Sequence, residues 1–322
     1  MIDFRYHIVS IVAIFLALAI GIVLGSTVLN APLYASTERV TAQLRASNAE
    51  NLAQLGVARA RGDAADAFVA ERLPQLLQGA LPGARVVIVE APGADAKLRD
   101  LVRQDLVAAG ATVSGQVTLT DKYLEAQRTG AIDRLAPVKA DVAGPTPTAA
   151  PGGRGAAALA GALLTGDPAL AGKATPAGTT LLESFAGEDL IDVEGGPADR
   201  ATLALLVAPA APFEGKDAET RGAALVSLAG ALDDAGQGTV VMGSVPVGTA
   251  TGVIAAVRDS GDVSAKVSTV DNADLAYGRA AVVYALREQL AGDAGQYGLG
   301  SDADAPVPSP TATPVPTEGS GD

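Results

Sequence analysis

The sequence contains no cysteine and no tryptophan, one histidine, His7, and two methionines, Met1 and Met242. Disulfides, thiolate metal sites and cysteine nucleophiles are therefore excluded. A Ser-His-Asp arrangement in the body of the chain is excluded too, because the only imidazole lies near the N-terminus. Soft metals need clusters of Cys, Met or His, and the chain offers none. We expect a protein that is not an enzyme, with no catalytic residues, no cofactor and no metal site of its own.

Positive charge is also scarce. Lys and Arg total 23 against 36 Asp and Glu, which gives a net charge of −13. This balance excludes binding to a nucleic-acid backbone, which needs clustered Lys and Arg side chains. It also excludes a basic patch as the link to anionic lipid headgroups.

Apolar residues do form one long run, residues 8–29, and no Asp, Glu, Lys or Arg occurs from 8 to 37. At ~1.5 Å per residue the run spans ~33 Å, enough for a hydrocarbon core of ~30 Å. The alternative is a cleaved signal peptide, whose apolar core is shorter and ends at a small-residue cleavage site. Length, and the flanking rings of Phe4, Tyr6 and Tyr34, favour a retained helix. We expect a single-pass protein of the cell membrane, with its N-terminus in the cytoplasm and its large part outside.

Small residues recur every four positions in this run, at Ala13, Ala17, Gly21 and Gly25. Such a ridge lets two membrane helices approach closely, so that van der Waals packing holds them together. The alternative is chance, because Ala and Gly are common in membrane spans. The pattern predicts a homo-oligomer or pairing with another membrane helix.

The rest of the chain divides by composition. After the N-terminal stub and membrane helix, residues 1–31, comes a polar helical stalk, residues 32–79, with a thin apolar stripe. The stripe is compatible with a short coiled coil or with a helix packed on its own domain. Pro32 predicts the end of the membrane helix.

Strand-like and helix-like segments then alternate. The first part, residues 80–136, contains a βαβ unit, and residues 156–292 continue the alternation. A Pro- and Gly-rich segment, residues 137–155, predicts a mobile loop, and the acidic Pro/Thr-rich tail, residues 293–322, predicts disorder. The expected strands are 85–90, 111–120, 202–208, 239–243 and 265–270, and the expected helices are 94–110, 156–166, 178–185, 218–235, 249–259 and 273–290. The pattern predicts an α/β fold, with a three-layer domain built on a mostly parallel sheet.

Two turns at the carboxyl ends of strands, where α/β proteins keep their sites, are candidate surfaces. Gly243, Gly248 and Thr249 resemble a phosphate-binding loop without its lysine, so an ordinary glycine-rich turn is favoured. In the second turn, capping of the following helix by Asn272 and Asp274 explains the polar residues. As a minority interpretation, these turns form a docking edge. Its residues are Gly243, Gly248, Thr249, Asp271, Asn272 and Asp274.

The opening "MIDFRYHIVSIVAIFLALAIGIVLGS" and the late segment "VSTVDNADLAYGRAAVVYALREQL" resemble the mycobacterial copper transport protein B (MctB) family of actinobacteria. The resemblance covers nearly the whole chain before the tail. It implies a role in copper transport or copper homeostasis, and for some members a channel in an outer membrane. One helix cannot line a pore alone, and parallel α/β alternation is not the pattern of a membrane barrel.

Two functions of different classes follow. The first is a copper-homeostasis protein that acts in an assembly. The second is a single-pass envelope scaffold whose α/β domain docks on cell-wall or division proteins.

Overall fold

The computed structural model describes residues 4–135, 152–245 and 248–309. The chain divides into two units, Met1–Ala65 and Asp66–Asp322. One stretch, Phe4–Gly25, is long and apolar enough to cross a membrane, and its side chains are exposed. This agrees with the expected position of the membrane helix.

Helix α1 (Phe4–Leu77) runs through the position where we expected the membrane helix to end. The predicted end near Pro32 is wrong, because a proline removes one helical hydrogen bond without necessarily ending the helix. The last turns of α1 belong to the second unit, where Leu73 and Leu77 are buried. The unit boundary therefore follows Ala65 and does not coincide with the expected end of the stalk at residue 79.

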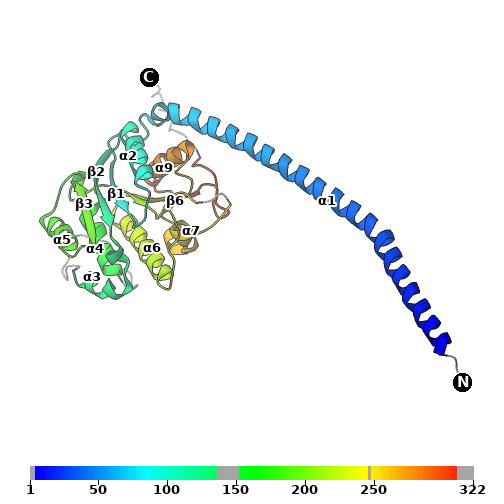
Figure 1. Ribbon diagram of the computed structural model, residues 1–322. Helices are drawn as coiled ribbons and strands as arrows, with labels where there is room; N and C mark the ends of the chain where they lie inside the picture. Colours follow the sequence, from blue (N-terminus) through cyan, green and yellow to red (C-terminus); the bar gives the residue numbers. More distant parts are fainter. Residues whose placement is uncertain (1–3, 136–151, 246–247, 310–322) are drawn as a thin grey trace. The chain divides into compact units, whose positions relative to one another are not determined.

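The second unit is built on a seven-stranded sheet with the strand order β3-β2-β1-β4-β5-β6-β7 (Figure 1). Five neighbouring pairs are parallel, and only β3 runs antiparallel, beside β2. The strands are β1 (Arg85–Glu90), β2 (Thr112–Leu119), β3 (Ile191–Gly195), β4 (Leu203–Val207), β5 (Gly238–Met242), β6 (Ser268–Val270) and β7 (Gln296–Tyr297). The expected mostly parallel sheet is confirmed.

Helices cover both faces of this sheet. On one face lie α3 (Thr129–Leu135), α4 (Gly153–Leu163), α5 (Pro176–Gly187), α6 (Ala218–Ala235) and α7 (Gly252–Asp259). On the other face lie α2 (Ala96–Ala108), α9 (Ala276–Gln289) and the end of α1. Side chains alternate along β1, since Val86 and Ile88 join one core while Val87 and Val89 join the other. The three-layer arrangement is confirmed.

Several segments differ from the expected ones. Strand β3 was not predicted, and the strand expected over 265–270 shortens to β6 because α8 (Gly261–Ser264) precedes it. Most of the predicted mobile loop lies outside the described residues, and its end is helical because α4 begins at Gly153. The predicted disorder from 293 onward is wrong up to residue 309, since β7 pairs with β6 and Tyr297 is buried. Residues 310–322 lie outside the described part.

Candidate functional site

The switch point of the sheet lies between β1 and β4, because the chain leaves β1 toward β2 on one side and later returns to its other side. Open α/β sheets bind ligands in the crevice at such a point. Here the two loops that would border the crevice are joined by backbone hydrogen bonds. The Ala210 amide donates to the Gly93 carbonyl at 2.9 Å, and Ala94 and Pro209 form an isolated antiparallel bridge. The usual ligand site of this fold is therefore closed.

The carboxylate at the end of β1 is engaged as well. Glu90 is 6% exposed. Its Oε2 accepts hydrogen bonds from Arg99 Nη1 at 2.5 Å and from Gln116 Nε2 at 3.0 Å. A buried carboxylate held by an arginine and an amide stabilises the junction of α2 with the sheet.

The predicted docking edge does not form one surface. Gly243, Asp271 and Asn272 are buried, whereas Gly248 and Asp274 are exposed. Thr249 does not begin a helix, because α7 starts at Gly252. The carboxyl ends of β5 and β6 meet through an Ser244–Asn272 bridge, which turns the polar side chains inward. These residues therefore stabilise the fold and do not form a continuous contact surface.

Capping by Asn272 is wrong. Helix α9 begins four residues later, at Ala276, and its N-cap position, Leu275, offers no side-chain acceptor. The Ala276 amide instead donates to Asp66 Oδ1 at 2.6 Å, so a residue near the end of α1 satisfies the helix start. Among the described residues, the side-chain amide of Asn272 has no hydrogen-bond partner.

Asp271 belongs to a buried polar cluster centred on Arg258 of α7. The Arg258 side chain donates to Thr269 Oγ1 at 2.8 Å, Asp271 Oδ2 at 2.9 Å, Asp302 Oδ1 at 2.7 Å and the Tyr297 carbonyl at 2.7 Å. Asp271 in turn accepts the amides of Leu299 at 2.7 Å and Gly300 at 2.9 Å. The cluster fastens the segment after β7 to the sheet, which explains why the chain stays folded beyond residue 292.

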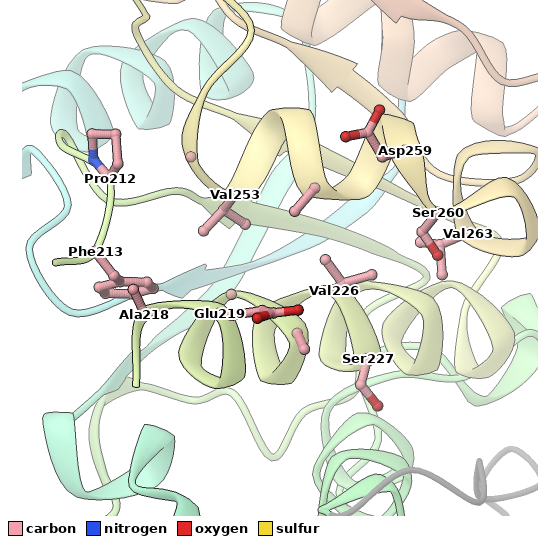
Figure 2. A pocket seen from close by; sticks show the side chains of 14 residues that line it. Pro212, Phe213, Ala218, Glu219, Val226, Ser227, Val253, Asp259, Ser260 and Val263 are labelled. Carbon is pink, nitrogen blue, oxygen red and sulfur yellow. The ribbon is translucent and has the colours of Figure 1, made fainter. Parts of the chain in front are cut away.

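An open groove with a volume of about 690 Å³ lies between α6 and α7. Figure 2 shows Val226 of α6 and Val253 of α7 pointing into the space between the helices, with the Phe213 ring at one end. Arg221 lies 4.2 Å from the centre of that ring and pairs with Asp121, which holds the ring in place. We call this feature the α6–α7 groove. Its lining residues are Pro212, Phe213, Ala218, Glu219, Gly222, Ala223, Val226, Ser227, Gly252, Val253, Ala256, Asp259, Ser260 and Val263.

Asp233, in the last turn of α6, is in an unfavourable place. Burial raises the pKa of its carboxyl to about 6, Lys266 counteracts part of this, and its Oδ1 has no partner. A carboxylate is also disfavoured at a helix C-terminus. Because the folded state holds the proton more tightly than the unfolded state, the contribution of Asp233 to stability is lost as the pH rises through about 6.

We therefore expect Asp233→Asn to raise the free energy of unfolding at pH 7 by about 1 kcal/mol, a fraction of the full shift because the carboxylate is partly exposed. The gain should shrink as the pH falls from 6 and should vanish below about 4, where both states of the wild type are protonated. Thermal melts of both chains across this range provide the measurement. A gain that is independent of pH would contradict the assignment to this carboxyl.

The predicted packing ridge of the apolar helix lies in the first unit. Gly21 and Gly25 have open space where a Cβ would be, and Ala13 and Ala17 are exposed. The ridge is therefore free of contacts within this chain's described residues, and its role in helix pairing stays a prediction.

For metals, the described residues contain no group of three or more His, Cys, Asp or Glu side chains that could hold an ion. Met242 is fully buried in the sheet, where it packs as a core residue. Among the buried carboxylates, Glu90, Asp105 and Asp271 already pair with arginines.

Sequence reasoning missed both the Arg258 cluster and the α6–α7 groove. The first had a weak signal, an arginine directly after the apolar residues 253–257. The second had one in its small residues, because Ala218 and Gly222 share one face of a helix, four residues apart. Neither signal identifies the partner segment.

Together these features define an α/β-domain protein with a candidate membrane span at Phe4–Gly25, a closed ligand crevice and an open interhelical groove. The family model described as "Copper transport outer membrane protein, MctB" matches residues 1–308. The chain belongs to this MctB family, as its two end segments suggested.

Curated relatives match over the same length. Proteins named "Copper transporter MctB" from Mycobacterium bovis and Mycobacterium tuberculosis are each 30% identical over 311 residues, covering 94% of this chain and 98% of the relative. The protein of that name from Mycobacterium leprae is 29% identical over 316 residues, with the same coverage.

Proposed function

We propose that this chain is a membrane-anchored, non-catalytic component of copper transport or copper homeostasis that acts within an assembly. The observation that supports this proposal most is the length of the match. The family model and the relatives extend over both the apolar helix and the α/β domain. The relatives are named copper transporters, and the match over both the helix and the domain supports the same role for this chain.

The anchor in this proposal is Phe4–Gly25, with the α/β domain outside the cytoplasm. The family's description speaks of an outer membrane. A strongly apolar helix instead favours retention in the cell membrane, since membrane barrels use alternating strands. The ridge of Ala13, Ala17, Gly21 and Gly25 would pair the helix with a second copy or with a partner's span.

An assembly is needed because copper(I) prefers thiolate, thioether and imidazole ligands. The chain has no cysteine and a single histidine, so in this proposal other members of the assembly hold the ion. The stalk could contribute to self-association, since Val40, Leu44, Leu52 and Leu55 of α1 expose more than half of their side-chain surface.

Calorimetric titration of the full chain in lipid nanodiscs tests the indirect role. We expect neither copper(I) nor copper(II) to bind tightly with a fixed stoichiometry. Tight, stoichiometric binding would show that the chain itself carries the ion, and the proposal of an assembly partner as the copper site would be wrong.

A deletion strain tests the physiological role. Loss of the chain should make cells copper-sensitive, and the full chain should restore tolerance, whereas a chain without residues 1–25 should not. Unchanged copper tolerance together with defective septation or chaining would instead support the second candidate, an envelope scaffold. The α6–α7 groove is the observation that favours this second candidate.

A further inference from the structure

The α6–α7 groove has the shape and charge of a receptor for a helix. We propose that it docks an amphipathic helix of another protein, whose apolar stripe is flanked by lysine or arginine side chains. This inference concerns a partner surface, and it holds whether or not the chain takes part in copper handling.

The floor of the groove is made of small and β-branched apolar residues at helical spacing. On α6 the lining positions include Ala218, Gly222 and Val226, each four residues after the last, and on α7 Gly252 and Ala256 repeat the pattern. Small residues let another backbone approach closely, and the valines give it apolar surface to cover. Helix-in-groove recognition places side chains of the ligand at i, i+3 or i+4, and i+7 along such a surface.

The rim of the groove is acidic. Glu219 and Asp259 line it directly. Glu214 and Asp217 before α6, and Asp262 in α8, are also exposed, against one exposed base near them, Lys216. Arg221 does not offset this charge, because it pairs with Asp121 and stacks on Phe213. An occupant that is apolar in the middle and basic at the edges complements this arrangement.

The same charge argues against other occupants. Two copies joined groove to groove by a twofold axis would place these carboxylates against one another. An anionic lipid surface would be repelled by the rim and by the net charge of −13. A bare metal ion lacks a site, since no group of three acidic side chains is close enough to hold one in the described residues.

The probe for the test is a fluorescent 18-residue helical peptide with leucine anchors and flanking lysines, titrated against the full chain in nanodiscs of neutral lipid. A second peptide carries glutamate in place of lysine. We expect the lysine peptide to bind at least about tenfold more tightly than the glutamate peptide, and its affinity to fall with salt.

Gly222→Leu is the decisive variant because it changes no charge. A Cβ at Gly222 meets nothing within 4 Å, so the new side chain enters the groove without displacing the fold. We expect it to weaken binding of the lysine peptide by about tenfold or more. The matched control is Gly187→Leu at the end of α5, a position that is equally open and far from the groove lining, which should bind as the wild type does.

A second variant tests the charge of the rim separately from the packing inside the groove. Glu219→Lys combined with Asp259→Lys should weaken binding of the lysine peptide, whereas the control Glu183→Lys, on exposed surface of α5, should have little effect. Equal binding of the two peptides would overturn the proposal, because the acidic rim would then play no part in recognition. Unchanged affinity in Gly222→Leu would overturn it too, because the net charge alone would then attract the peptide.

Discussion

Replacing Arg258 by methionine is expected to lower the free energy of unfolding by about 3–5 kcal/mol. Methionine retains much of the volume of the arginine stem but removes all the donors. The Asp271 side chain, which is 0% exposed, would then be a buried carboxylate without its counter-ion. Four acceptors, including the Tyr297 carbonyl, would lose the hydrogen bond from this arginine at once. Denaturant unfolding of the full chain in nanodiscs, followed by circular dichroism, measures the effect.

The matched control is Arg128→Met. Arg128 pairs with Glu125 at 3.1 Å, but their side chains are 39% and 43% exposed, so solvent weakens the pair and can replace it. We expect a loss of at most about 1 kcal/mol there. The double variant Arg258→Met with Asp271→Asn should cost about 1–3 kcal/mol less than the sum of the two single variants, because it removes the uncompensated charge.

In Arg258→Met, we also expect the segment after β7 to open locally more often than the whole domain unfolds. The amides of Leu299 and Gly300 donate to Asp271, and β7 is only two residues long. We expect these amides to exchange with deuterium much faster in the variant, while amides of β4 keep their protection. If Arg258→Met loses no more stability than Arg128→Met and these amides exchange as before, the cluster does not fasten the C-terminal segment.

Segments whose signal is local were well predicted from the sequence. The strand over 85–90 and the helix over 218–235 match β1 and α6. A β-branched run between breakers, and an alanine- and leucine-rich stretch that ends at Gly236, define their own ends. Strand β3 was missed because its alternation of Ile191 and Val193 with Asp192 and Glu194 covers only four residues, too few to stand out from a loop. Four of its five residues are exposed, as suits a sheet edge. Strand β7 is too short to have a pattern, and only its hydrogen bonds to β6 and Arg258 make it a strand.

The candidate site was less predictable, because its features depend on residues distant in the chain. Asp271 lies 13 residues from Arg258, and Asp302 lies 44 residues from it. The first amide of α9 is bound by Asp66, 210 residues earlier in the chain. A rule that considers only neighbouring residues assigned this capping to Asn272, because it could not include so distant a residue. The groove likewise needs two helices that the fold alone brings together. The sequence shows which side chains are polar. Whether such a side chain lies on a surface open to a partner or inside the core depends on its burial, which only the fold determines.

Gly278→Ala is the second change with a large expected effect, and its sign is opposite to that of most such substitutions. In the interior of a helix, alanine normally stabilises relative to glycine by up to about 1 kcal/mol. Gly278, however, lies in α9 against the turn after β6. A Cβ there would be 2.5 Å from the carbonyl carbon of Asn272 and closer still to its oxygen. Backbone cannot move aside as a flexible side chain can, so we expect a loss of about 3 kcal/mol or more.

The matched control for this prediction is Gly222→Ala in α6, where a Cβ meets nothing within 4 Å. Helix propensity then acts alone, and we expect a gain of about 0.5–1 kcal/mol. Unfolding of both variants beside the wild type therefore gives shifts of opposite sign from the same chemical change. A loss of stability confined to Gly278→Ala shows that α9 needs a glycine in order to contact the turn that buries Asp271. A gain at both positions would mean that this contact is looser than the geometry requires, because α9 would then have room to shift along the sheet.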